Sequence, residues 1–336
     1  MVWVAVDAMG GDHAPRNIID GAIAAVRHFE LGVALVGPAS LLEAELTRHS
    51  DVDRTRVRIV DADEVVAMED APTAALRRKP RASIKVAADT VARGEADALV
   101  SAGHTGATVM AAYAAFGMLP GVDRPALAAT IPTPHRPAIL LDVGASVECR
   151  PQHLLQFGVM GSVYARVAFG IRTPRVGLLS IGEEATKGNE LTREAHRLLK
   201  AAPLSFIGNI EARDVYTGQA DVIVCDGFTG NVALKISEGL VDVIEGLISE
   251  ELSSTIAMRV GSLLTRRAMR HLRRRTDYSE YGGAPLLGVG GVTIVGHGRS
   301  SAKAVRNAVA SAYRFAADRF ILRVQDDIAA AAIHHT

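Results

Sequence analysis

The sequence predicts a three-layer α/β/α protein built on a largely parallel sheet. Short apolar runs rich in Val, Ile and Leu recur along the 336 residues, and segments with helical apolar spacing separate them. Many of these runs lead directly into turns that contain glycine. Strands that alternate with helices in this way form parallel sheets covered by helices on both faces. Because 49% of the residues are apolar, the chain can bury the large core that this fold requires.

Nine apolar runs supply the predicted strands. Most are rich in the β-branched residues that favour an extended backbone. In chain order they are residues 2–6, 33–36, 57–60, 98–100, 139–143, 176–181, 204–207, 222–225 and 292–295. No linker or fixed-period repeat interrupts the alternation, so we expect a single domain over residues 1–336.

One segment departs from this pattern. Residues 252–276 contain no acidic residue, and seven arginines accumulate within them. Apolar residues from Ile248 to Leu264 recur at helical spacing, so we expect residues 240–280 to form an amphipathic, arginine-rich helical insertion that projects from the sheet. Three roles for this insertion stay open: packing in the core or a dimer, contact with a membrane surface, or docking of an acidic partner.

Charge and cysteine content narrow the class of protein. The 37 basic and 37 acidic residues balance, which argues against a surface built to bind nucleic acid. Cys149 and Cys225 stand far apart, so neither a disulfide framework nor a cysteine zinc site is expected, and a reducing cytoplasm fits. No run of about 18 apolar residues is present to cross a bilayer.

Glycine turns after the predicted strands are the candidate binding loops. In an open α/β sheet such turns gather at the carboxyl edge, where ligands bind. They are residues 9–12, 101–106, 143–146, 181–184 and 226–230. The turn at 226–231 is the most informative, because unpaired N–H groups at a helix start favour a phosphate or a developing oxyanion. Neither the Gly-x-Gly-x-x-Gly dinucleotide pattern nor a Gly-x-x-x-x-Gly-Lys-Ser/Thr phosphate loop is present.

Polar residues near these turns are candidates for chemistry. Two interpretations of Lys187 stay open. It could neutralise the charge of a bound dianion, or it could be a solvated surface lysine beside Asn189, which would cap the next helix. For His13 and His104 three roles stay open: a general base, a hydrogen-bond donor to phosphate, or no role in the chemistry. No ligand spacing typical of a metal site occurs, and Ser101 lacks the Gly-x-Ser-x-Gly context of a serine hydrolase.

Taken together, six motifs resemble those of the PlsX family, the phosphate acyltransferases of bacterial phospholipid synthesis. They occur in the family's order and span nearly the whole chain. They are residues 6–15, 100–107, 123–127, 187–191, 226–231 and 281–289. The chain departs from the family pattern at His104 and at Gly290, where the family usually has asparagine.

The resemblance implies a reaction and its partners. A long-chain acyl group would pass from acyl-acyl-carrier protein to inorganic phosphate, and a membrane glycerol 3-phosphate acyltransferase would use the acyl phosphate. No cofactor and no metal are implied, and no nucleic acid. The resemblance also implies a homodimer in the cytoplasm, bound peripherally to the anionic inner face of the cell membrane. Its fold would be similar to those of the phosphotransacetylases and the isocitrate and isopropylmalate dehydrogenases.

The resemblance, together with this chemistry, assigns roles to residues. Lys187 would neutralise charge at phosphate or the oxyanion, and the Asn231 amide would donate to the thioester oxygen. The remaining phosphate and substrate contacts are expected from the glycine turns: Gly10, Gly11, Asp12, His13, Ser101, Gly103, His104, Thr105, Gly106, Asp226, Gly227, Thr229 and Gly230. Membrane or carrier contact is expected from Leu263, Leu264, Arg266, Arg267 and Arg270.

Three alternatives remain beside this prediction. A phosphotransacetylase-like enzyme would use the same chemistry on coenzyme A thioesters. A non-catalytic membrane-surface scaffold would need the amphipathic segment but not the polar residues of the glycine turns. A dehydrogenase of related fold is weakened by the missing dinucleotide pattern.

Overall fold

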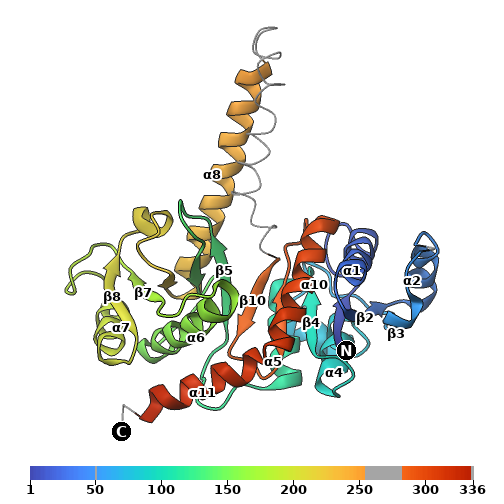
Figure 1. Cartoon of the computed structure of the whole chain (residues 1–336), viewed down its shortest axis with the longest axis horizontal. Helices are drawn as coiled ribbons and strands as arrows, with labels where there is room; N and C mark the ends of the chain where they lie inside the picture. Colours follow the sequence, from blue (N-terminus) through green and yellow to red (C-terminus); the bar gives the residue numbers. More distant parts are fainter. Residues whose placement is uncertain (50, 254–281, 334–336) are drawn as a thin grey trace.

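The computed structural model describes residues 1–49, 51–253 and 282–333 (Figure 1). They form an 11-stranded sheet with the strand order β3-β2-β1-β4-β11-β10-β5-β6-β9-β7-β8. Helices pack on both faces of this sheet, so the predicted three-layer α/β/α fold is confirmed.

The N-terminal half of the sheet contains five parallel strands. They are β3 (Val57–Asp61), β2 (Leu31–Gly37), β1 (Val2–Asp7), β4 (Ala98–Ser101) and β11 (Val292–Val295). Two helices that pack against each other cover one face, α1 (Arg16–His28) and α10 (Ala302–Ala317). The other face carries α4 (Ser83–Ala92) and α5 (Thr105–Phe116), and shorter helices lie at the periphery: α2 (Ala39–Leu46), α3 (Pro72–Arg78) and η1 (Arg54–Arg56).

The second half contains four parallel strands. They are β6 (Ala138–Leu141), β9 (Val222–Val224), β7 (Arg175–Leu179) and β8 (Ser205–Ile210). The helices of this half are α6 (Pro151–Phe169), α7 (Glu190–Ala201), α8 (Gly227–Ser253), α11 (Phe320–Ile333) and the short η2 (Ala212–Tyr216). Strands β6 and β7 each end two residues earlier than the sequence predicted, at Leu141 and Leu179.

Two strands that the sequence analysis missed join the halves. They are β5 (Ala126–Ile131) and β10 (Ala284–Leu287), and β10 is antiparallel to both β11 and β5, while β5 is antiparallel to β6. The two parallel groups consequently run in opposite directions. The expectation of a single carboxyl edge was therefore wrong, and two such edges exist.

Apolar side chains fill the space on each face of the sheet and connect the two halves. One cluster includes Val4 of β1 and Leu178 of β7, and the other includes Ala5 and Ile223. Alternate residues of β1 thus point to opposite layers, as expected for a strand covered on both faces.

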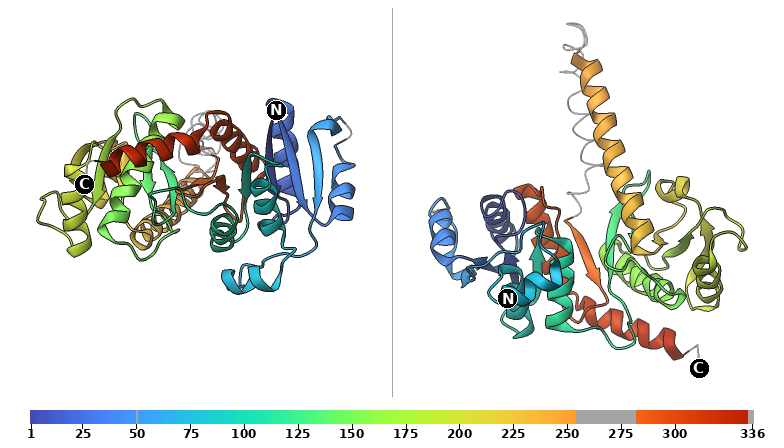
Figure 2. Two further views of the ribbon diagram at one scale, coloured as in Figure 1. Left: turned by 90° about the horizontal axis from the view of Figure 1, so that it is seen from below. Right: turned by 180° about the vertical axis from the view of Figure 1, so that it is seen from behind.

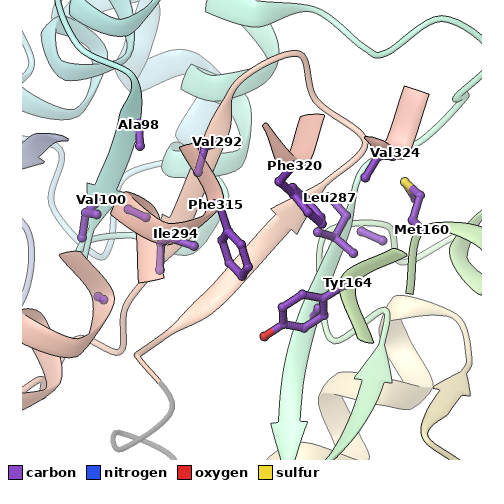
Figure 3. Close-up of a cluster of buried hydrophobic side chains, with 14 of the residues drawn as sticks. Ala98, Val100, Met160, Tyr164, Leu287, Val292, Ile294, Phe315, Phe320 and Val324 are labelled. Carbon is purple, nitrogen blue, oxygen red and sulfur yellow. The ribbon is translucent and has the colours of Figure 1, made fainter. Parts of the chain in front are cut away.

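An aromatic cluster lies where the halves meet (Figure 3). The ring of Tyr164 on α6 contacts Phe315 on α10 edge to face, with the ring centres 5.6 Å apart, and Phe315 contacts Phe320 on α11 at 5.0 Å. Figure 2 shows α11 (red) reaching from α10 toward the side of α6 (green), where Arg166 and Asp327 form an ion pair. These contacts fix the halves relative to each other.

Helix α8 begins at the sheet and extends away from it (Figure 1). Its described part includes residues 240–253 of the predicted insertion, while residues 254–281 lie outside the described residues, as do Leu263, Leu264, Arg266, Arg267 and Arg270. The single-domain organisation stays a prediction. Within the described part of the chain, no helix combines the length and apolar character needed to span a membrane.

Candidate active site

A cavity of 530 Å³ lies between the two halves of the molecule. Glycine turns from both halves line it, although their strands run in opposite directions. The N-terminal half contributes Asp12, Gly103, Thr105 and Gly106, and the second half contributes Val143, Gly144, Val147, Gly227, Phe228 and Asn231. Strands β5 and β10 add an apolar wall with Leu127, Ala129 and Ala284. Predicted turns from four strand ends are thus brought to one cavity.

The turn that starts α8 uses most of its amides within the protein. The Asp226 carboxylate accepts the Thr229 N–H at 2.9 Å and the Thr229 hydroxyl at 2.7 Å, which is a helix cap. The Gly227 N–H donates to the Ser146 carbonyl at 2.9 Å. Asp226 already supplies the negative charge that the helix start favours. The interpretation of this turn as an open anion cradle is therefore too simple.

Asn231 lies one turn further along α8 with an exposed side chain that lines the cavity. A β-carbon built on Gly144 would lie 3.7 Å from Asn231 Oδ1, so the amide of Asn231 faces the turn after β6. Among the described residues, no hydrogen bond occupies this amide. It is consequently available to donate to a bound carbonyl oxygen.

Asp142 holds the turn that faces Asn231. Its fully buried carboxylate accepts four backbone N–H groups, from Leu127 at 2.8 Å, Gly144 at 3.0 Å, Ala145 at 3.0 Å and Ser146 at 2.6 Å. Burial raises the pKa of Asp142, and the four donors act in the opposite direction. The carboxylate organises the 142–146 turn and does not reach the cavity.

The turns of the N-terminal half are tied together by a second buried carboxylate. The Ser101 hydroxyl donates to Asp7 Oδ2 at 2.7 Å and accepts the Gly103 N–H at 3.1 Å. A β-carbon on Gly10 would lie 2.7 Å from the Gly103 nitrogen, so glycine is required for this close approach. Ser101 is buried and its hydroxyl is already bonded, so it positions the turn. Its predicted contact with phosphate or substrate stays a prediction.

The first turn of α5 lies at the cavity, and its first backbone N–H groups form no hydrogen bond with other described residues. His104 is the helix cap, and its Nδ1 accepts the Ala107 N–H at 3.4 Å. Asparagine is a preferred residue at such a cap, and the His104 ring nitrogen accepts the same kind of backbone hydrogen bond. The first-turn N–H groups of Thr105 and Gly106 have no intrahelical partner and lie at the cavity wall. Gly11 lies close to the turn after β11, because a β-carbon on it would be 3.0 Å from the Gly298 carbonyl oxygen.

Lys187 and His13 do not line the cavity. Lys187 is exposed in the loop after β7, the strand beside β9, and Asn189 caps α7 by accepting the Thr192 N–H at 2.9 Å. His13 is exposed beyond the first glycine turn. The assigned roles of these residues stay predictions, as do those of the remaining glycine-turn residues.

The structure adds a basic cluster that the sequence analysis missed. Lys235 and Glu238 on α8 and His297 and Arg299 after β11 line the same cavity. Burial and then the charge of Lys235 lower the pKa of His297. The sequence contained a signal for this turn. Residues 296–301 read Gly-His-Gly-Arg-Ser-Ser and, like the other glycine turns, they lie between a strand and a helix. Within the described ranges, no group of side chains is arranged to hold a metal ion.

Comparisons with known proteins show the family to which the chain belongs. A family model described as "Fatty acid synthesis protein" matches residues 2–323. A phosphate acyltransferase from Heliobacterium modesticaldum is 50% identical over 325 residues, which is 97% of each chain. The chain belongs to the PlsX family of phosphate acyltransferases. A second member of the family, from Geobacter sulfurreducens, is 47% identical over 93% of the chain and 90% of its own length.

The fold extends beyond the PlsX family. A phosphotransacetylase from Streptococcus pyogenes superimposes with a TM-score of 0.66 at 16% identity, over 94% of both chains. The EutD phosphotransacetylase from Staphylococcus aureus gives a TM-score of 0.60 at 17% identity over the same shares. The expected similarity to the phosphotransacetylase fold is confirmed.

Proposed function

We propose that this phosphate acyltransferase transfers a long-chain acyl group from acyl-acyl-carrier protein to inorganic phosphate. The acyl phosphate product then serves a membrane glycerol 3-phosphate acyltransferase. The observation that carries the proposal is the cavity itself, which Asn231 lines together with glycine turns from both halves. Family membership supplies the acyl donor and phosphate as reactants.

The chemistry needs positioning and electrostatic stabilisation. A phosphate oxygen attacks the thioester carbonyl carbon, and the carbonyl oxygen becomes the oxyanion of a tetrahedral intermediate. The C–S bond then breaks. The phosphoryl group releases the hydrogen that hydrogen phosphate carried, and the thiolate takes up one proton from solvent, so the protons balance. Asn231 Nδ2 donates to the oxyanion, where a preorganised donor is most effective. The site brings phosphate to about 3–3.5 Å from the carbonyl carbon.

The two cysteines do not offer a covalent route through an acyl-enzyme. Burial raises the pKa of the Cys149 thiol to about 11. Burial also raises the pKa of Cys225 well above its usual range. Because the thiolate is the nucleophile, neither residue is activated near neutral pH. This supports direct attack by phosphate.

Lys187 is proposed to neutralise charge on phosphate or the oxyanion from the loop beside the Asp226 turn. Lys187→Ala should then lower kcat/KM about ten-fold or more, because a charge-assisted contact is lost. Lys200→Ala, at the exposed end of α7, is the matched control and should leave turnover unchanged. Equal turnover in both variants would make Lys187 a surface lysine.

A homodimer is proposed on the exposed apolar stripe of α8. Ile236, Leu240, Val243 and Leu247 are 57–65% exposed and follow a 4-3-4 spacing. This is the heptad pattern by which helices pack in pairs. The stripe therefore supports association of α8 with a second copy of the chain.

The double variant Leu240→Gln and Leu247→Gln should shift the protein from dimer to monomer, because the packed apolar surface is lost. Light scattering after gel filtration measures the mass. Ser249→Gln on the same helix is the control and should remain dimeric. A double variant that keeps the mass of the unmodified protein would contradict this interface.

The arginine-rich residues 252–276 support a proposed site of action at the anionic inner face of the cell membrane, with the enzyme in the cytoplasm. The basic side chains suit anionic lipid, and the apolar residues at helical spacing suit the interface. Contact through Leu263, Leu264, Arg266, Arg267 and Arg270 remains part of this proposal, as does docking of the acidic carrier protein on the same segment.

The choice of acyl carrier tests the proposal directly. The same long-chain acyl group should be presented on acyl-carrier protein and on coenzyme A, with phosphate held constant. We expect a clearly higher kcat/KM with the carrier protein. A specificity constant that is equal or higher with coenzyme A would instead assign the phosphotransacetylase-like activity.

A further inference from the structure

The basic cluster of the cavity combines residues from segments that are far apart in the sequence. Lys235 lies on the third turn of α8, and His297 and Arg299 lie on the turn between β11 and α10. The Lys235 and Arg299 charges both act on His297, which agrees with their shared position in the cavity. No residue of this cluster belongs to the motifs assigned a role above.

The cluster lies next to the proposed carbonyl site. Asn231 and Lys235 are four residues apart on one helix, so their side chains share a face and lie about 6 Å apart along the axis. Both line the cavity, and Gly296, His297 and Arg299 line the wall contributed by the other half of the molecule. An anion held beside Lys235 would therefore adjoin a carbonyl held by Asn231.

The side chains of the cluster can donate hydrogen bonds to the oxygens of a bound anion such as phosphate. Arg299 is exposed, and its guanidinium forms no ion pair within the part of the chain that the structure describes. His297 Nδ1 accepts the Arg299 backbone N–H at 3.2 Å, which ties the ring to the turn that carries Arg299. Lys235 Nζ pairs with Glu238 at 2.7 Å and keeps further donors, because an ammonium group has three.

The carboxylates at the cavity add selectivity. Asp12 is joined to the same turn through its backbone N–H, which donates to the Gly298 carbonyl at 2.8 Å. Its carboxylate lies close by, since a β-carbon on Gly298 would be 3.4 Å from Asp12 Oδ1. A carboxylate only accepts hydrogen bonds. It favours an anion that still carries an O–H, such as hydrogen phosphate, and disfavours sulfate, which carries none.

We propose that inorganic phosphate binds between Lys235 and the 296–299 turn, with Arg299 and Lys235 donating to its oxygens and Asp12 accepting its hydroxyl hydrogen. The site rests on the proposed function, for which it supplies the nucleophile. Glu238 orients Lys235. An oxygen without a hydrogen points along α8 toward the carbonyl at Asn231 and attacks it, while the O–H of hydrogen phosphate is on a different oxygen, which faces Asp12.

Steady-state kinetics with varied phosphate and saturating acyl-carrier protein substrate tests this site. Arg299→Gln and Lys235→Gln should each raise KM for phosphate about ten-fold or more, while KM for the acyl donor stays within about two-fold. Arg299→Lys should recover part of the loss, because charge remains without the guanidinium geometry. Lys303→Gln removes a neighbouring exposed charge outside the cavity and should leave both constants unchanged.

Sulfate competition tests the role of Asp12. Asp12→Asn should raise KM for phosphate and lower the inhibition constant of sulfate several-fold, because the repelled anion gains a donor. The proposed phosphate site would be wrong if KM for phosphate were unchanged in Arg299→Gln and Lys235→Gln. It would also be wrong if KM for the acyl donor rose as much as KM for phosphate. The unmodified protein separates this failure from failure of the proposed function, since without phosphate-dependent thiol release the function itself is wrong.

Discussion

Asn231→Ala should lower kcat for acyl phosphate formation about 10²–10³-fold, because it removes a preorganised donor from the oxyanion. KM for the acyl donor should change much less, since the donor acts mainly in the transition state. The side chain is exposed and forms no hydrogen bond with another described residue, so the fold should survive the change. Stopped assays of thiol release with circular dichroism as a folding check measure both effects.

Asn231→Asp is the informative companion variant. It keeps the size of the side chain but replaces the amide donor with a negative charge facing a developing oxyanion. We expect a loss at least as large as for alanine. Near-normal turnover in either folded variant would remove Asn231 from the mechanism.

The second large effect is structural. Asp142→Ala should destabilise the protein by about 4 kcal/mol or more, because four backbone N–H groups lose their acceptor in a buried site. The 142–146 turn would also lose its shape opposite Asn231, so residual folded protein should be poorly active. Urea unfolding followed by circular dichroism measures the stability change.

Asp226→Ala provides the matched control for this variant. Asp226 is also a carboxylate that accepts a backbone N–H, but it acts as an ordinary cap of α8. Its loss should cost only about 0.5–2 kcal/mol. Equal destabilisation by the two variants would contradict the central role given to Asp142.

The sequence predicted the strands whose composition is typical of buried parallel strands. Runs such as Val33 to Val36 are apolar and β-branched, and they form strands at the expected positions. Strand β5 was missed because it reads Ala-Leu-Ala-Ala-Thr-Ile, with little β-branched content. Strand β10 was missed because it contains a proline and follows two glycines. Since these two strands reverse the sheet, its direction in the second half was not predictable locally.

In the candidate site too, local features were predictable from the sequence and tertiary contacts were not. Glycine turns are local features, so the sequence located those that line the cavity. The use of their amides depends on tertiary partners: the Gly227 N–H is taken by Ser146, and Ser101 by Asp7. The cluster of Lys235, His297 and Arg299 forms only when α8 and the turn before α10 meet across the cavity. The spacing of residues within either segment alone does not predict that the two segments lie on the same cavity.

The departures from the family pattern have different consequences. His104 retains the capping role at α5, beside the cavity. Gly290 lies in the turn between β10 and β11 against Phe116, whose carbonyl oxygen would be 2.7 Å from a β-carbon at this position. It does not line the cavity, so its effect is on packing at that turn.

Phosphate-dependent cleavage of a long-chain acyl-acyl-carrier protein tests the central claim most directly. Free carrier thiol should be counted in the presence and absence of phosphate, and the product should be trapped with hydroxylamine after the carrier is removed. We predict that thiol release requires phosphate and that each thiol is matched by one trapped acyl group. Thiol release without phosphate, or release with phosphate that yields only free fatty acid, would contradict the account.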